Sequence, residues 1–244
     1  MTLMLFSVHS YASFAMVVHD YDLNISGLAL ASCVMLPREL QSGAPDFLTD
    51  AQKGKGITVA IGDVDGFNLP VGSQALKDGK YANEVVKAMV DALPHDKQTK
   101  QYMAITHKDR LIENVSYHLG SGFSEGNSEG GSYLGVSLWA VAIQNTSVHN
   151  TYHEMFLGYS QSNASTMKGR LNDSLKRVVD NNLGDVRCTD KYNVSSHLAF
   201  TRVIDHNTGK DDIDTFFSPE GSYNRDAILG LINKEAYQVL LLSD

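Results

Sequence analysis

Short apolar runs separated by polar stretches dominate the first part of the chain. Residues Phe14–Val18 and Leu28–Leu36 are apolar, and the polar stretch from His19 to Ser26 separates them. Gly56–Gly62 is another continuous apolar run, with glycine at both ends. Continuous runs of this length are typical of strands that are buried on both faces of a sheet. We therefore predict buried strands at Leu28–Leu36 and Gly56–Gly62.

Other segments carry apolar residues at the three- and four-residue steps of an amphipathic helix. Tyr81–Leu93 has this spacing, and Pro94 then stops the predicted helix. Leu171–Val179 and Arg225–Leu242 have the same spacing and are also predicted to be helical. Tyr133–Ile143 is apolar enough to form a buried helix.

Strands and helices therefore alternate along the chain. This alternation is typical of a mostly parallel sheet that is covered by helices on both faces. We predict one α/β domain over residues 1–244, a three-layer α/β/α sandwich with a doubly wound, mostly parallel sheet. A chain of this length can bury a full core in one domain. In this prediction, residues 1–27 can form a peripheral N-terminal extension of the domain.

A glycine-rich turn follows the strand that alternation predicts at Ile112–Leu119. Gly122–Gly126 reads GFSEG and matches G-x-S-x-G, the sharp turn between a strand and a helix that exposes a serine in α/β-hydrolases. Asp185 and His197 follow in the Ser…Asp…His order of that fold. Acyl transfer at a serine needs a base and an acid that orients the base. We predict Ser124 as the nucleophile, His197 as the base and Asp185 as the acid.

The same chemistry needs hydrogen-bond donors for the oxyanion. The first predicted donor is the backbone N–H of Glu125, the residue after the nucleophile. The second is Ser42, in a loop after an earlier strand. Ser128 is an alternative nucleophile, because Gly126–Gly130 also fits G-x-S-x-G. A flexible glycine-rich loop without catalytic residues is the plain alternative for this stretch.

These motifs resemble, in one collinear order, those of the cutinases, small secreted serine esterases of the α/β-hydrolase fold. Leu119–Gly126 is similar to the G-Y-S-Q-G elbow of that family. Gly184–Thr189 and His197–Phe200 are similar to its G-D-x-V-C and H-L-x-Y segments. Ala31–Cys33 resembles the start of its first core strand, and Phe156–Tyr159 resembles the strand after the elbow helix.

The resemblance implies hydrolysis of short or medium-chain carboxylic esters, small or polymeric and cutin- or lipid-like, through an acyl-serine intermediate. We expect neither a metal nor an organic cofactor, and a monomer. The chain departs from the family at Glu125, where a neutral glutamine is usual, and at its cysteines. The family's partner for Cys188 falls near Asp180, and Cys33 has also lost its mate, so a pairing of these two cysteines with each other stays open. The departures favour the alternative of a catalytically inactive scaffold or binding protein.

Two further motifs admit other chemistry. His149 and His153 are spaced i and i+4, which places two potential zinc ligands on one face of a helix. A third ligand is missing from the motif, and exposed histidines near a turn are the preferred interpretation. Asp63–Gly66 reads DVDG, which is similar to the D-x-D-G of phosphatases that form an aspartyl-phosphate. The preferred interpretation is an acidic turn.

Charge and processing signals limit the partners and the compartment. The 28 acidic and 20 basic side chains give a net charge of −8, which argues against a nucleic-acid surface. Met1–Val18 lacks a basic n-region and is too short and interrupted to span a membrane. An excess of Asn-x-Ser sequons favours secretion, and the six are at Asn24, Asn114, Asn145, Asn163, Asn172 and Asn193. We predict a secreted protein with no transmembrane segment.

Overall fold

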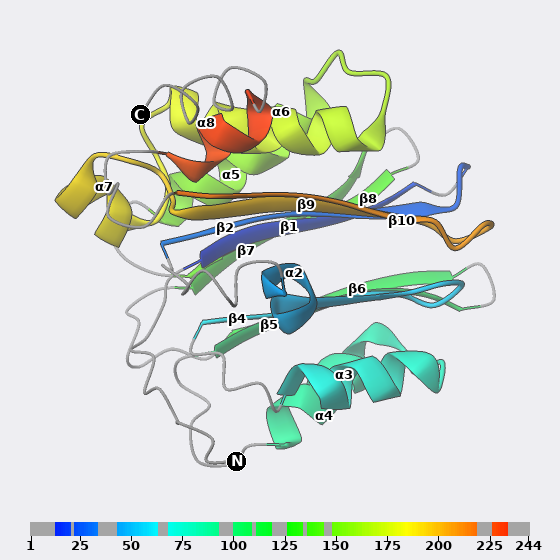
Figure 1. The fold of residues 1–244 in the computed structure, drawn as a ribbon. Coiled ribbons are helices and arrows are strands. Elements are labelled where there is room, and N and C mark those ends of the chain that lie inside the picture. The colour runs from blue at the N-terminus through cyan, green and yellow to red at the C-terminus, as the bar shows by residue number, and fades with distance from the viewer. Residues whose placement is uncertain are drawn as a thin grey trace.

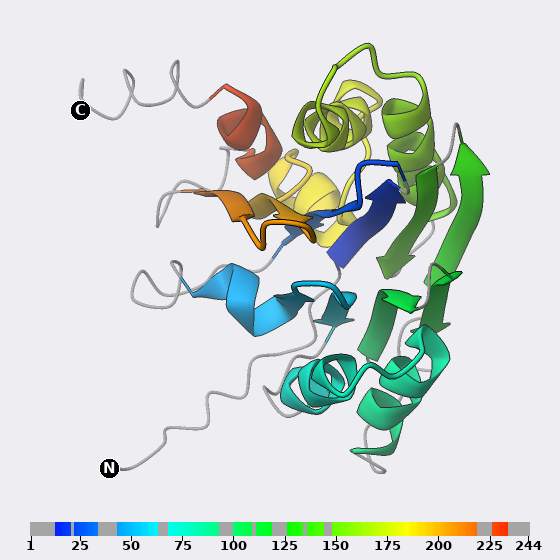
Figure 2. The same ribbon diagram turned by 90° about the vertical axis from the view of Figure 1, so that its right-hand side faces the viewer.

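The computed structural model describes ten stretches of the chain: residues 13–20, 22–33, 43–62, 68–92, 100–108, 111–118, 126–133, 136–143, 148–218 and 226–233. They form four layers, in which two sheets pack face to face and helices cover the outer face of each sheet (Figure 1). The same four layers can be followed in the perpendicular view (Figure 2).

Sheet A has six strands in the order β10-β9-β2-β1-β8-β7. Every pairing among these described strands is antiparallel. β1 and β2 form a hairpin that pairs Ser13 with Ser32 and Asp20 with Ile25. The Asp20 carboxylate accepts hydrogen bonds from the backbone N–H groups of Asp22 and Leu23, which fixes the hairpin turn. The strands are β1 (Ser13–Asp20), β2 (Ile25–Ser32), β7 (Gly126–Tyr133), β8 (Val136–Ile143), β9 (Leu198–Asp205) and β10 (Asp211–Phe217).

Sheet B has four strands in the order β3-β4-β5-β6, and its described pairings are also antiparallel. A short helix, α2 (Ala44–Leu48), leads into it, and two longer helices pack on its outer face. The apolar side of α4 faces the sheet through Val85, Val86 and Met89, all of which are buried. The elements are β3 (Thr49–Gln52), β4 (Gly56–Gly62), β5 (Lys100–Lys108), β6 (Leu111–His118), α3 (Asn68–Lys77) and α4 (Ala82–Asp91).

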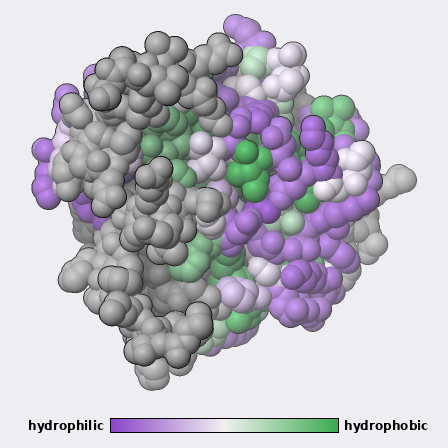
Figure 3. All heavy atoms as spheres, viewed as in Figure 1, coloured by the Kyte–Doolittle hydropathy of each residue, from purple (hydrophilic) through white to green (hydrophobic). Residues whose placement is uncertain are grey.

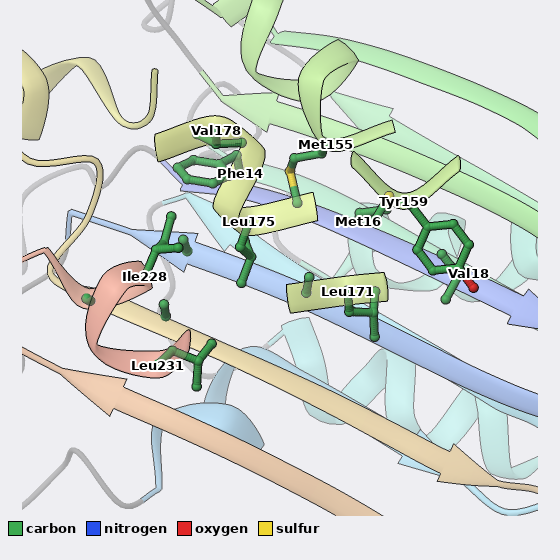
Figure 4. Close-up of a cluster of buried hydrophobic side chains, with 14 residues drawn as sticks. Phe14, Met16, Val18, Met155, Tyr159, Leu171, Leu175, Val178, Ile228 and Leu231 are labelled. Atoms are coloured by element: carbon green, nitrogen blue, oxygen red, sulfur yellow. The ribbon is translucent and has the colours of Figure 1, made fainter. Parts of the chain in front are cut away.

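The two faces of sheet A carry two different apolar cores. On β1, the even-numbered residues Phe14, Met16 and Val18 pack beneath helices α5 (Val148–Ser160), α6 (Met167–Asp180) and α8 (Ala227–Ile232), as Figure 4 shows. The odd-numbered residues Ala15 and Val17 point between the sheets, where they meet residues of β4 and β5. The alternation of a strand thus assigns the apolar residues Phe14–Val18 in turn to the two cores.

The exterior is largely polar. On the part of the face in Figure 3 that the described residues form, hydrophilic residues predominate and hydrophobic ones occur in small groups. Among the residues whose side-chain burial the structure describes, the large hydrophobic side chains that are exposed are Leu23, Phe47 and Val71. Among the same residues, no helix is both long and apolar enough to cross a membrane.

The predicted three-layer α/β/α sandwich with a doubly wound, mostly parallel sheet is wrong. Tyr133–Ile143 is not a helix, since it spans the end of β7 and all of β8. Phe156–Tyr159 is not a strand, since it lies inside α5. A continuous apolar run is compatible with a buried strand and with a buried helix, and its neighbours in space decide between them. β8 lies between β1 and β7 in the interior of sheet A.

Several local predictions are confirmed. Gly56–Gly62 is β4, Ile112–Leu119 matches β6, and Tyr81–Leu93 matches α4. Leu171–Val179 lies within α6, and α8 falls in the predicted C-terminal helix. The first 27 residues, which were allowed as a peripheral extension, supply β1 and the start of β2, two interior strands of sheet A.

Candidate functional site

The first residue of β1 is a buried serine. The hydroxyl of Ser13 donates a hydrogen bond to the hydroxyl of Ser32, with 2.9 Å between the oxygens. Ser13 is 4% exposed and Ser32 is 1% exposed. Ser13 lies on the same side of β1 as Ala15 and Val17, which face sheet B. The hydroxyl pair therefore lies between the two sheets, at one end of sheet A.

His197 immediately precedes β9 at the same end of the sheet. Its backbone N–H donates to the Ser32 carbonyl at 2.9 Å, so it extends the ladder that β9 forms with β2. The His197 ring is buried and meets the edge of the Tyr192 ring, with 5.1 Å between the ring centres. Burial lowers the pKa of His197, because it disfavours the charged imidazolium.

Asp185 joins this end of sheet A to helix α7 (Val186–Tyr192). Its carboxylate caps the helix by accepting from the Arg187 N–H, and its Oδ2 accepts from the backbone N–H of Cys33 at 3.1 Å. The Arg187 guanidinium adds an ion pair at 2.8 Å. Burial raises the pKa of Asp185, while the charge and hydrogen bonds of Arg187 oppose this rise. The hydrogen bonds of this carboxylate thus hold backbone segments together.

A disulfide joins Cys33, just after β2, to Cys188 in α7. The cutinase resemblance implied that each cysteine had lost its partner, but the two pair with each other across 155 residues of sequence. Both sulfurs and one ring nitrogen of His197 lie within 4.8 Å of one another. The end of β2 and the segment from α7 to the start of β9, which are distant in sequence, therefore meet beside α7 (Figure 1).

The segment before His197 is also buried and polar. The Asp226 carboxylate caps α8 and accepts from the Ser195 backbone N–H, while the Ser195 hydroxyl donates to the Leu183 carbonyl at 2.6 Å. The hydroxyl of Ser196 is buried and has no hydrogen-bond partner within the described part of the chain. Burial raises the pKa of Asp226. The sequence predicts no role for Ser195 or Ser196, because single serines carry no motif.

Most of the predicted nucleophile loop cannot be placed. Ser42, Ser124 and Glu125 lie outside the described residues, as do the acidic turn residues Asp63 and Asp65. Their predicted roles therefore stay predictions. The chain after Ser124 enters strand β7 instead of the helix that a nucleophile elbow requires.

Ser128 lies in β7, opposite Val141 of β8, which in turn lies opposite Ala15 of β1. Two strand spacings, about 10 Å, therefore separate the backbones of Ser128 and Ala15. The segment with His149 and His153 is helical, as part of α5, although it lacks clear helical periodicity.

A second buried polar cluster lies at the opposite end of sheet A. The Ser26 hydroxyl is 2.8 Å from His19 Nδ1 and 2.7 Å from His206 Nε2. The Gly54 backbone N–H donates to His206 Nδ1 at 3.0 Å, so this nitrogen is an acceptor. A neutral His206 then donates through Nε2 to Ser26, whose hydroxyl donates to His19. This cluster ties sheet A to the β3–β4 turn of sheet B.

The same end of the molecule has a cleft of about 470 Å³ beside the start of α6. Its lining includes Asp20, Tyr159, Lys168 and Arg170. Lys168 is already paired with Asp212 and Asp214 of β10, at 3.1 Å and 2.5 Å. The charge of Lys168 in this cleft is therefore neutralised by neighbouring carboxylates.

The fold is similar to that of a solved structure described as protein SPO2555 from Silicibacter pomeroyi, of the family DUF1028. The TM-score is 0.65, the match covers 93% of this chain and 88% of that one, and the sequence identity is 14%. A likeness at this identity shows the fold alone. No family model and no curated protein matches the chain. This neighbour and the antiparallel sheets overturn the resemblance to cutinases and the α/β-hydrolase fold.

Proposed function

We propose that this protein hydrolyses carboxylic esters or amides, with Ser13 as the nucleophile and the α-amino group of Ser13 as the base. The observation that supports the proposal is the position of Ser13. It is the first residue of an interior strand, and its hydroxyl is held by Ser32 between the two sheets. A hydroxyl residue with a free α-amine carries the nucleophile and the base of acyl transfer in one residue.

The proposal requires that the chain be cleaved between Ala12 and Ser13. Ser10-Tyr11-Ala12 has the small residues three positions and one position before the cut that a secretory processing site requires. The apolar segment Leu3–Val8 precedes it, in a stretch that lacks the basic n-region of a typical secretory signal. Secretion also agrees with the Cys33–Cys188 disulfide, because disulfides persist in oxidising compartments. Removal of a leader would thus create the catalytic amine.

The chemistry then follows from ordinary acidities. An α-amino group has a pKa of about 7.7–8.0, so a useful fraction of it is neutral near pH 7.5 and can accept a proton. This amine takes the proton of the Ser13 hydroxyl while the oxygen attacks the substrate carbonyl carbon. The ammonium returns the proton to the leaving alcohol or amine, and an acyl-Ser13 ester remains. Water, deprotonated by the same amine, releases the acid and restores Ser13.

Ser32 positions the nucleophile in this scheme. Its hydroxyl lies 2.9 Å from that of Ser13 and can donate to the Ser13 oxygen once the Ser13 hydroxyl turns its proton to the amine, and its carbonyl is held by the His197 N–H. The acyl-serine chemistry predicted from the sequence is kept, while its nucleophile is assigned to Ser13. Ser124 and Ser128 are the competing nucleophiles, with His197 and Asp185 as the competing base and acid.

The test compares hydrolysis of p-nitrophenyl butyrate and of butyryl p-nitroanilide by four forms of the processed protein. These are the wild type and the variants Ser13→Ala, Ser13→Thr and Ser124→Ala. We expect loss of activity in Ser13→Ala, partial activity in Ser13→Thr, and unchanged activity in Ser124→Ala. N-terminal mass spectrometry should find Ser13 as the first residue of the active protein. Full activity of folded Ser13→Ala contradicts the proposal, and an inactive wild type favours the scaffold or binding protein.

A further inference from the structure

The cluster of Cys33, Cys188 and His197 has the composition of a metal site. Their sulfur and ring-nitrogen atoms lie within 4.8 Å of one another, and two of the three residues are buried. In a tetrahedral zinc site with Zn–S bonds of about 2.3 Å, two thiolate sulfurs are about 3.8 Å apart. After reduction, zinc binding requires the two sulfurs, which are bonded to each other in this structure, to separate to that distance by side-chain rotation while the His197 nitrogen stays nearby.

We propose that the reduced form of this protein binds one zinc ion through the thiolates of Cys33 and Cys188 and the imidazole of His197. Two thiolates and one imidazole form a Cys₂His ligand set, which leaves one tetrahedral position open to water or to an added ligand. The two negative charges of the thiolates balance the charge of the ion. In the oxidised form the two sulfurs are bonded to each other, and the site is closed to metal.

The three ligand backbones are held together without the disulfide. The Cys33 N–H donates to the Asp185 carboxylate, and the Cys188 N–H donates to the Asp185 carbonyl at 2.8 Å. The His197 N–H donates to Ser32, the residue before Cys33. None of these bonds involves a sulfur or the imidazole ring. Reduction therefore leaves the backbone anchors of the site in place, so that the metal binds a preorganised set of ligands.

Conversion of the disulfide form to the zinc-bound form requires two electrons, and a dithiol can supply them. The dithiol supplies two electrons to the Cys33–Cys188 bond and becomes a disulfide itself. Zinc then binds the two protein thiolates, and two protons are released. Because zinc binds only the reduced form, free zinc shifts the equilibrium toward that form. The site thus links the redox state of the protein to zinc.

This site is separate from the proposed nucleophile. Ser13 and Ser32 face the space between the sheets, while the neighbouring positions on β2 and β9, Ala31 and Ala199, face the helices. Cys33 and His197 continue the helix-facing alternation of those strands. Zinc binding therefore needs neither cleavage before Ser13 nor hydrolytic activity, and each proposal can fail without the other.

The test adds Co²⁺ alone to the protein after reduction with a trialkylphosphine, without oxygen, while circular dichroism monitors the fold. We expect one equivalent of Co²⁺ to give thiolate-to-cobalt absorption and strong visible bands of a tetrahedral ion, and Zn²⁺ to displace it. Cys33→Ser should abolish the thiolate absorption, and His197→Gln should weaken binding at least about tenfold. His153→Gln, a change at an exposed histidine of α5, should leave binding unchanged.

Three results would overturn the proposal. The first is a folded, reduced wild type that gives no thiolate absorption with Co²⁺. The second is a His197→Gln variant that binds Co²⁺ with the affinity and spectrum of the wild type. The third is a reduced protein that loses its folded dichroism signal and does not regain it when Zn²⁺ is added.

Discussion

The hydroxyl of Ser13 lies 2.9 Å from the hydroxyl of Ser32, directly across the β1–β2 hairpin. Both groups are nearly inaccessible to solvent, although each begins or ends a strand, where exposure is usual. The hydrogen bond to Ser32 satisfies the buried hydroxyl of Ser13, which would otherwise be costly to bury. This relationship makes Ser32 the residue that fixes the direction of the Ser13 oxygen.

The role of Ser32 predicts a selective loss of catalysis. Ser32→Ala removes the partner of Ser13, so the nucleophile samples other rotamers, and we expect kcat to fall about tenfold with little change in KM. Ser32→Thr keeps a hydroxyl and should retain most of the activity. Steady-state kinetics on p-nitrophenyl butyrate measures both effects. Equal kcat values for Ser32→Ala and the wild type would exclude the positioning role.

Gly184 is predicted to be irreplaceable for backbone reasons. Its φ is +145°, and a Cβ atom there would lie 2.5 Å from the Ser195 carbonyl oxygen. We expect Gly184→Ala to lower the free energy of unfolding by about 3 kcal/mol or more, because backbone must move. The matched control is Gly54→Ala, with φ of +66° and no heavy atom within 4 Å of the added Cβ. We expect Gly54→Ala to lower the free energy of unfolding by only about 1 kcal/mol. Similar urea midpoints for the two variants would contradict the prediction for Gly184.

Asp226 predicts a pH dependence of stability. Burial raises its pKa in the folded state, so the folded protein holds this proton more tightly than the unfolded chain does. The stability that this bound proton contributes is fully present below the ordinary pKa of an aspartic acid, about 3.9. It is lost as the pH rises through the raised pKa of Asp226 in the folded protein. Asp226→Asn keeps a helix-capping side chain without the charge. We expect its stability relative to the wild type to increase between pH 4 and pH 7.

Urea unfolding at several pH values measures this effect. Its size should be about 1.4 kcal/mol for each unit by which the pKa of Asp226 is raised. Asp78→Asn removes the same charge at an exposed position and serves as the matched control. A pH-independent difference for Asp226→Asn would show that the carboxylate is not penalised by burial.

The Ser26 hydroxyl is predicted to stabilise the packing of the two sheets. Ser26→Ala takes the hydrogen bond away from His19 Nδ1 and from His206 Nε2, both in buried side chains. Each unsatisfied buried group costs about 1–3 kcal/mol, so we expect a loss of at least about 2 kcal/mol in unfolding free energy. Ser160→Ala, which removes a hydroxyl bonded to its own helix, should change it by less than about 0.5 kcal/mol. Equal losses in the two variants would contradict the prediction.

Helices and strands could be predicted from the sequence where glycine or proline residues mark their ends. Gly56–Gly62 is apolar between two glycines, and Tyr81–Leu93 has a complete helical period before Pro94, so both predictions are confirmed. Tyr133–Ile143 has no such boundary. Its state is decided by pairing with β1, more than 100 residues earlier, and local propensity does not contain that information. The direction of the strands is likewise a long-range property.

The candidate site also combines residues that local sequence motifs predict with features that only long-range contacts determine. The structure places Asp185 and His197 at one end of sheet A, and it joins Cys33 to Cys188 there. The proposed nucleophile, Ser13, is the first residue of its strand, and no sequence motif surrounds it. The sequence signal for it is Ser10-Tyr11-Ala12, which comes just before a buried strand. This tripeptide lies in the segment Met1–Val18, which lacks a basic n-region.

Whether Ser13 is the nucleophile can be measured by locating the residue that a serine-directed probe phosphonylates. The processed protein is treated with a fluorophosphonate, digested, and analysed by peptide mass spectrometry. The account predicts a single adduct on Ser13, with Ser13 as the first residue of its peptide and no adduct in Ser13→Ala. An adduct on Ser124 or Ser128 that persists in Ser13→Ala would contradict it.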